Sequence, residues 1–434
     1  MLDTVKKMVK SLRVKGSSTR HVGILATGTA LSQAIVIAAS PILTRLYTPA
    51  DFGLVSLYMA CAAVLVIFAT GAYEQAIVIP ASDEEALNIT VFTLLLCGVV
   101  SALTLIPVIF FGHAAANLLG SPQIANWFYL LPVTVAATGA FATLQFWCNR
   151  KSEYRQMTMN RLQSSGFTAV ANIALGLTKT SGGMILGTTL GQFLATSILT
   201  RHFIKTQRPD FSSVNFKTQW EMAKKYRRHP LHLAPGYLIG SAAEQVTIFM
   251  IGSLFSLATL GFFSMAYKLI SLPSMVVARA IGDVYRQRIS VAYNERGQFR
   301  DIFLKTLATT TVVALPPFFI LYLIAPWLFA TVLGSDWRIA GEYAQILVVG
   351  SFFHFIVAPV DKGVFIVGAS KYLLLWFSGR LVSFLILLFA AGHYSLGIVQ
   401  VLWIFVGINI FFYLLHASVN FYLSRGNPKA SNSA

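Results

Sequence analysis

Three ionisable side chains lie deep inside long apolar runs of this sequence of 434 residues. They are Glu244, Lys268 in the run GFFSMAYKLISLPS, and Arg380. A charge inside such a run is costly in a membrane, so each is expected to face a partner, a water-filled cavity or a bound ligand. Glu244 and Lys268 could form a buried ion pair that fixes helix packing, or they could bind an ion or an anionic substrate.

The depth of each group within its apolar run separates candidate site residues from interfacial ones. At about 1.5 Å per residue, Lys268 lies about 17 Å, Glu244 about 21 Å and Arg380 about 12 Å from the start of its predicted helix. We therefore take these three as the substrate-binding candidates of a cavity. Gln33 and His354 also lie near mid-depth, where they could be packing residues, although His354 could relay protons. Four more secondary candidates lie near the interfaces and could snorkel into the headgroups: Arg45, Glu74, Asp361 and Lys362.

The composition is that of a polytopic membrane protein. Hydrophobic residues make up 56% of the chain and charged residues only 11%, whereas a soluble protein has about 25% charged residues. The net charge of +17 is explained better by basic loops that fix membrane orientation than by nucleic-acid binding. The three cysteines are too widely spaced for a metal motif, so we expect them to be packing residues.

Twelve apolar runs are long enough to cross a bilayer, which takes about 20 residues. With the N-terminus inside, 27 of the 33 Lys and Arg residues lie on the cytoplasmic side, three outside and three within spans. This asymmetry predicts both termini in the cytoplasm. The ninth run contains Pro316, Pro317 and Pro326, which predict a kink or break. The runs are 22–43, 52–74, 87–111, 124–147, 159–178, 182–203, 230–252, 257–279, 303–333, 341–366, 372–392 and 396–423.

A weak internal repeat divides the chain into halves. The segment LYTPADFGLVSLYM, Leu46–Met59, aligns with LFSLATLGFFSMAY, Leu254–Tyr267, at an offset of 208, and Gly53 matches Gly261. We therefore predict an all-α membrane protein with twelve transmembrane helices in two parallel six-helix lobes around a central cavity. TQWEMAKKYRRHP, between the lobes, is typical of a basic amphipathic helix on the membrane surface. The predicted parts are a basic arm (1–21), an N-terminal lobe (22–203), a linker helix (204–229), a C-terminal lobe (230–423) and a tail (424–434).

Motifs for most enzyme chemistry are missing from the sequence. It contains no GxxxxGK[ST] phosphate loop, no HExxH, no CxxC, no GxSxG and no Asp-x-Asp pair. We therefore expect no ATP hydrolysis, no metal, no cofactor and no enzymatic activity. The predicted outer loops are short, which argues against a polysaccharide polymerase or ligase with catalytic groups outside the membrane.

One segment carries a family resemblance. ASPILTRLYTPADFGLVSLYMACAAVLVIFATGAYEQAIVIPASDEEA, Ala39–Ala86, resembles the Wzx-type polysaccharide flippases of the multidrug/oligosaccharidyl-lipid/polysaccharide exporter superfamily. The matching features are PILTRLYTPADFG, a Tyr-Glu pair followed by AIVIP, and an acidic DEEA loop. Arg45, Tyr73 and Glu74 are motif positions without an assigned role. Members often carry a basic residue just before the Tyr-Glu pair, a place that Ala72 takes here.

The resemblance implies what the protein transports. It implies alternating access that moves an undecaprenyl-pyrophosphate-linked oligosaccharide, such as an O-antigen, capsule or exopolysaccharide unit, across the bacterial inner membrane. The partners expected with it are this lipid-linked substrate, membrane lipids and other polysaccharide assembly proteins, with no nucleic acid and with function as a monomer. The main alternative is an ion-coupled exporter of drugs or small cations, in which Glu244 would dominate. A membrane polymerase or ligase and a structural scaffold are the remaining alternatives.

Overall fold

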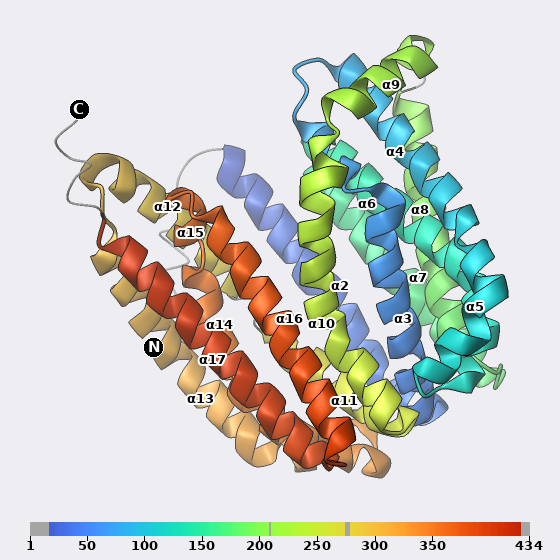
Figure 1. The fold of residues 1–434 in the computed structure, drawn as a ribbon, viewed down its shortest axis with the longest axis vertical. Helices are drawn as coiled ribbons and strands as arrows, with labels where there is room; N and C mark the ends of the chain where they lie inside the picture. Colours follow the sequence, from blue (N-terminus) through green and yellow to red (C-terminus); the bar gives the residue numbers. More distant parts are fainter. Residues whose placement is uncertain (1–16, 208–209, 274–277, 427–434) are drawn as a thin grey trace.

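The computed structural model describes residues 17–207, 210–273 and 278–426, and every regular element in these ranges is a helix (Figure 1). Most of the predicted basic arm and of the predicted tail lies outside the described residues. In the N-terminal half the helices are α2 (Ser17–Leu46), α3 (Pro49–Thr70), η1 (Tyr73–Val78), α4 (Asp83–Leu103), α5 (Leu105–Leu118), η2 (Pro122–Leu130), α6 (Leu131–Arg150), α7 (Tyr154–Leu177) and α8 (Gly183–Gln207).

A short linker and a second set of helices complete the chain. The linker contains η3 (Asp210–Ser213), α9 (Phe216–Lys225) and η4 (His229–Leu233). In Figure 1, α12 to α17 lie on the left and α3 to α8 on the right, with α2 and α10 running between them. The helices of the C-terminal half are α10 (Ala234–Leu254), α11 (Leu257–Pro273), α12 (Arg279–Arg296), α13 (Arg300–Leu333), η6 (Ser335–Trp337), α14 (Arg338–Val357), η7 (Ala358–Val360), α15 (Gly363–Ile366), α16 (Ser370–His393) and α17 (Ile398–Ser424).

The structure confirms an all-α membrane protein, whereas the count of twelve spans stays a prediction. Among the described residues, ten helical segments are long and apolar enough to cross a membrane. The apolar part of α11, Leu257–Leu272, is shorter than these ten segments. The helix α7 is not among them, and its first half is polar because it carries Arg155, Gln156, Asn160 and Arg161.

We expect reporter fusions to place the C-terminal end of α13 and the C-terminus of the chain on opposite sides of the membrane. A reporter fused at Ala434 should be active on the cytoplasmic side, and one inserted at Gly334, in the turn after α13, should be active on the other side. The physical reason is the excess of Lys and Arg on one side of the membrane. Signals from the same side at both positions would contradict twelve spans.

A proline interrupts the third predicted apolar run, whereas the ninth run forms one continuous helix although it contains three prolines. The third predicted run is two helices, because Pro107 has no N–H to donate to the carbonyl of Leu103, and α4 ends at that residue. In contrast, the ninth predicted run is the single helix α13 despite its three internal prolines. The predicted break is therefore absent there, and the alternative of a kink stays a prediction.

Two amphipathic helices lie outside the spans, and the sequence predicted only one of them. The predicted linker helix is present as α9, whose first turn is capped by the side chain of Asn215, 2.7 Å from the amide of Thr218. The basic residues between the eighth and ninth runs predict a loop where the structure has the helix α12. Its apolar residues Tyr285 and Ile289 recur four apart and are buried, which is the pattern of a surface helix.

The linker is fastened to the N-terminal half. The hydroxyl of Tyr73, in the Tyr-Glu motif, donates to the carbonyl of Ala223 in α9 at 3.0 Å. The DEEA segment, which the sequence predicts as a loop, forms the first turn of α4. Its Glu85 pairs with Lys225, at the end of α9, at 2.9 Å, and this hydrogen bond raises the pKa of Lys225. After α9 the chain passes through η4, a π-helical turn that contains Pro230, into α10. The attachment of α9 therefore fixes the position at which the C-terminal half begins.

The repeat segments contact each other at the junction of the halves. A Cβ atom added at Gly53 in α3 would overlap the carbonyl oxygen of Leu257, and one added at Gly261 in α11 would overlap that of Pro49. Each added Cβ would also lie 3.1 Å from the amide nitrogen of the opposite glycine. Leu257 and Gly261 are the repeat equivalents of Pro49 and Gly53. The contact therefore has an approximate two-fold symmetry, and only glycine permits it.

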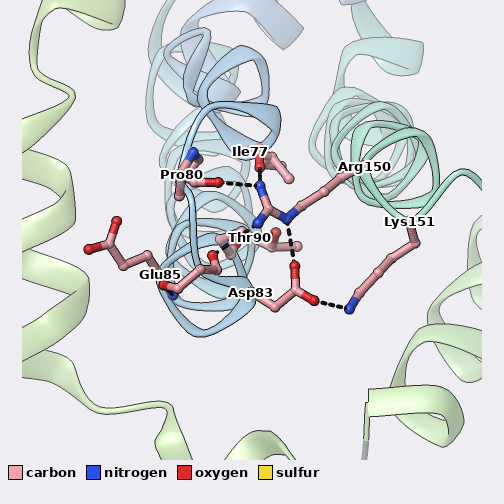
Figure 2. Close-up of polar contacts among 9 residues, drawn as sticks. Ile77, Pro80, Asp83, Glu85, Thr90, Arg150 and Lys151 are labelled. Carbon is pink, nitrogen blue, oxygen red and sulfur yellow. Dashed lines mark hydrogen bonds and ion pairs between the residues drawn. The ribbon is translucent and has the colours of Figure 1, made fainter.

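Arg150 joins the end of α6 to the loop between η1 and α4 (Figure 2). Its guanidinium donates to the carbonyl oxygens of Ile77 at 3.2 Å and Pro80 at 2.8 Å and to that of Ser82 at 3.0 Å. Its Nε also donates to Asp83 at 2.9 Å, while Lys151 reaches the other carboxylate oxygen at 2.7 Å. The planar fork of arginine thus satisfies three backbone carbonyls that a lysine could not reach together.

We expect Arg150→Ala to lower the free energy of unfolding by about 2–3 kcal/mol, because partly buried carbonyls lose their donors. Thermal unfolding of the purified protein in detergent would measure the change. Lys151→Ala is the matched control, since it removes a cation from the same exposed carboxylate and should cost less than about 1 kcal/mol. Equal losses for both variants would show that the ion pair to Asp83, and not the carbonyl contacts, carries the stability.

Candidate functional site: a charged cavity between the two halves

The three deep ionisable residues line one cavity. The cavity has a volume of about 360 Å³ and lies where α3 of the N-terminal half meets α10, α11, α16 and α17 of the other half. Glu244 enters it from α10, Lys268 from α11 and Arg380 from α16. The wall contributed by α3 is small and uncharged, and includes Ser56 and Ala60. The chemistry of the cavity is therefore supplied by the C-terminal half.

Arg380 is the most enclosed charge of the site. Its residue is only 8% exposed, and Nη2 donates to the side-chain oxygen of Asn409 on α17 at 2.8 Å. The guanidinium also lies over three rings, with its carbon 5.4 Å from the centroid of Phe384, 5.5 Å from Trp376 and 5.9 Å from Tyr413. The faces of aromatic rings attract a cation, but they do not accept all of the hydrogen bonds that its N–H groups can donate.

One donor of this guanidinium has no acceptor. Nε of Arg380 is buried and has no hydrogen-bond partner in the described part of the chain. A buried donor without a partner costs about 1–3 kcal/mol, more for a charged group. An anionic oxygen entering the cavity would satisfy it. The arrangement therefore suits a phosphate or carboxylate group, which arginine binds through parallel N–H donors.

Glu244 interacts with Arg380 instead of Lys268. The carboxylate of Glu244 and the guanidinium of Arg380 interact electrostatically, and the structure records no such interaction between Glu244 and Lys268. None of these three described side chains forms a direct ion pair with another. The Glu244–Lys268 ion pair that the sequence suggested is therefore not formed in this structure, and Lys268 forms no ion pair with any carboxylate in the described part of the chain.

The site also contains aromatic and polar neighbours that the sequence analysis does not predict. Tyr267 lines the cavity beside Lys268, and its ring stacks on Phe263 with 5.7 Å between centroids. The ring of Tyr413 contacts that of His354 in a tilted arrangement, with 5.2 Å between centroids. The sequence does indicate two of the rings around Arg380, because Trp376 and Phe384 lie four residues before and after it and so share its helix face. The contribution of Asn409 has no local signal, since it comes from another helix.

The secondary candidates are dispersed. His354 lies near Arg380, with which it interacts electrostatically, although it is not among the residues that line the cavity. Gln33 in α2 is also outside the lining. The remaining four lie elsewhere: Arg45 donates to the carbonyls of Pro41 at 2.6 Å and Val332 at 3.4 Å, Glu74 lies in η1, and Asp361 pairs with Lys362 at 2.8 Å between η7 and α15.

Comparison with known families and proteins shows one matching family model and several similar proteins. A family model described as "Polysaccharide biosynthesis protein" matches residues 42–341. The succinoglycan biosynthesis transport protein ExoT of Rhizobium meliloti (strain 1021) is 22% identical over 337 residues. This match covers 76% of the chain and 65% of the relative, so the chain spans less than two thirds of that protein's length.

Solved structures with the same fold are membrane transporters. The lipid II flippase MurJ in an inward closed conformation superposes with a TM-score of 0.70, covering 92% of this chain and 89% of that chain at 14% identity. A MATE-family multidrug resistance transporter in an inward-facing conformation gives 0.59, covering 94% and 95% at 17% identity. At these identities the similarity establishes the fold alone.

Proposed function

Because this chain belongs to the polysaccharide biosynthesis protein family, we propose that it is a flippase for a lipid-linked oligosaccharide. Membership agrees with the resemblance carried by residues 39–86. The proposed substrate is an oligosaccharide on undecaprenyl pyrophosphate, moved from the cytoplasmic to the outer leaflet of the bacterial inner membrane. Both termini are in the cytoplasm in this proposal, and the chain acts as a monomer.

The observation that carries the proposal is the cation-bearing cavity at the junction of the halves. A pyrophosphate in the membrane needs cations and hydrogen-bond donors to replace its water. Among the described residues, Nε of Arg380 is a buried donor without an acceptor, and Lys268 is a second cation in the same cavity that forms no ion pair. Alternating access would expose this cavity to each side in turn as the halves rock about the α3–α11 contact.

Transport in vesicles tests the proposal. Purified full-length protein is reconstituted into liposomes with a fluorescent lipid-linked oligosaccharide, and the label that reaches the outer leaflet is quenched or cleaved from outside. The expected result is transfer without ATP, because the sequence has no phosphate loop. The proposal would be refuted by transfer no faster than in liposomes carrying an equal amount of an unrelated membrane protein.

A second candidate function rests on Glu244. A carboxylate in the cavity could bind a proton, Na⁺ or an organic cation, as an ion-coupled exporter of small cations requires. The cavity holds two cations beside this one carboxylate, which favours an anionic substrate. Uptake of an organic cation such as ethidium into the same liposomes, driven by a pH or Na⁺ gradient, would favour the second candidate if it exceeded oligosaccharide transfer.

A further inference from the structure

A second cavity lies within the N-terminal half, away from the junction of the halves. It has a volume of about 1120 Å³ and is a groove whose floor is α6 and whose walls are α4 with the start of α5 on one side and α8 on the other. These helices form the right-hand side of the molecule in Figure 1. The groove shares no lining residue with the charged cavity, so the proposed transport site does not account for it.

Small side chains make the floor and one wall of the groove. Ala136 and Ala140 of α6 leave space between the flanking helices, and so do Gly98 and Ala102 of α4. A Cβ atom added at Gly98 would meet nothing within 4 Å. The apolar side chains at the edge are exposed, among them Phe193 and Ile204, each 49% exposed. In a membrane, the groove therefore opens to lipid and not to water.

The other wall ends in two cations. Ser197, Arg201 and Lys205 follow one another every four residues and so form a single row along α8, and all three line the groove. Arg201 and Lys205 are exposed and form no ion pair with any side chain that the structure describes. The nearby carboxylate of Glu153 instead lies 3.3 Å from His202. One end of this apolar groove therefore carries two cations that pair with no carboxylate in the described part of the chain.

The length of the groove matches one leaflet of a bilayer. The twelve-residue separation of Phe193 and Lys205 on α8 corresponds to about 18 Å, and half of the hydrocarbon core is about 15 Å. The cations are at the end of α8 that leads into the linker, which is the predicted cytoplasmic side. The groove thus runs from the headgroup level of the inner leaflet to about the middle of the membrane.

We infer that this groove is a binding site for one anionic phospholipid of the inner leaflet. An acyl chain lies over Ala136 and Ala140 between α4 and α8, and the phosphate contacts Arg201 and Lys205. Basic pockets between transmembrane helices on the cytoplasmic side bind anionic headgroups in this way. The site is separate from the transport cavity, so it would position or stabilise the N-terminal half and would not carry cargo.

Native mass spectrometry of the full-length protein tests this site with two lipids of defined charge. The protein in detergent is titrated with phosphatidylglycerol and, separately, with phosphatidylethanolamine. We expect one phosphatidylglycerol to bind more tightly than any phosphatidylethanolamine. Each cation near an anionic group contributes a factor of about 5, so Arg201→Gln with Lys205→Gln should weaken that binding about 30-fold.

Two matched controls separate the groove from general surface charge. Arg286→Gln with Arg288→Gln removes the same charge from exposed positions of α12 and should leave the tight phosphatidylglycerol in place. Gly98→Leu fills the groove without changing its charge and should also prevent binding. Gly407→Leu makes the same change at an exposed position of α17 where a Cβ meets nothing within 4 Å, and should have no effect.

Three results would overturn the inference. They are equal binding of the two lipids, an equal loss from the α12 double variant, and undiminished phosphatidylglycerol binding by Gly98→Leu. Thermal unfolding of each variant without added lipid serves as the folding check. Leucine forms helices better than glycine by several tenths of a kcal/mol, so Gly98→Leu should not unfold α4.

Discussion

Arg380→Met should reduce transport of the lipid-linked oligosaccharide by at least about 30-fold while the protein remains folded. Removing a buried, hydrogen-bonding charge from its ligand costs about 2–5 kcal/mol of binding. Methionine has a similar length and no charge, and the carboxylate of Glu244 is exposed at the cavity, so the substitution leaves no buried carboxylate without a partner. Folding and transport should therefore separate, which they would not do if Arg380 only packed the C-terminal half. Liposome transfer and thermal unfolding of the same preparation measure the two quantities.

The conservative variant tests the geometry of the site. Arg380→Lys keeps the charge but loses the planar fork that lies over Phe384 and Trp376, so it should recover only part of the transport. Arg338→Met is the matched control, because Arg338 is an exposed cation whose contact to Glu342 is 3.6 Å long. Full transport by a well-folded Arg380→Met protein would rule out a substrate contact for this residue.

Removal of Lys268 should reduce transport for the same reason as removal of Arg380, but by a smaller factor. Its side chain is exposed at the cavity and free of Glu244, so Lys268→Ala should not leave a buried carboxylate unpaired. Removing Lys268 together with Glu244 should leave a folded, inserted protein with impaired transport, whereas Lys268→Arg should keep part of the activity. A fully active double variant would confine the site to Arg380 and its aromatic neighbours.

Local features of the sequence predict the helices and the deep charges well. Long apolar runs and unpaired charges are local patterns, and the structure brings Glu244, Lys268 and Arg380 to one cavity as a site of this kind requires. The partners of each charge are not local. Asn409 reaches Arg380 across 29 residues of chain, and whether Glu244 interacts with Lys268 or with Arg380 depends on how α10, α11 and α16 rotate against one another.

The motif residues show a second limit of sequence reasoning. Tyr73 and the DEEA segment could be recognised as a pattern, but their contacts are with residues far along the chain, namely Ala223, Arg150 and Lys225. Their observed role is to fasten the linker and α6 to one end of the N-terminal half. The residue types of Tyr73 and Glu85 do not distinguish this structural role from substrate binding, since either role uses charged and hydroxyl groups.

Gly53→Ala should push α3 and α11 apart and strongly impair transport. The added Cβ overlaps a backbone carbonyl of α11, which cannot move aside by changing a rotamer. Overpacking of this kind costs about 1–3 kcal/mol. If the closed contact is one of two states in the transport cycle, that cost shifts their ratio by a factor of about 5 to 150. Spin labels at the exposed residues Lys179 and Tyr394, on a background with the native cysteines replaced by alanine, should then move apart.

The approximate symmetry of the contact makes the test sharper. Gly261→Ala places its Cβ against the carbonyl of Pro49 just as Gly53→Ala does against that of Leu257, so the two variants should have effects of equal size. Gly407→Ala, in open space on α17, should change neither the label distance nor transport. If one glycine variant transports normally and the other does not transport, the contact does not act as a symmetric unit. Equal effects would mean that the repeat persists because both halves close on the same pair of glycines.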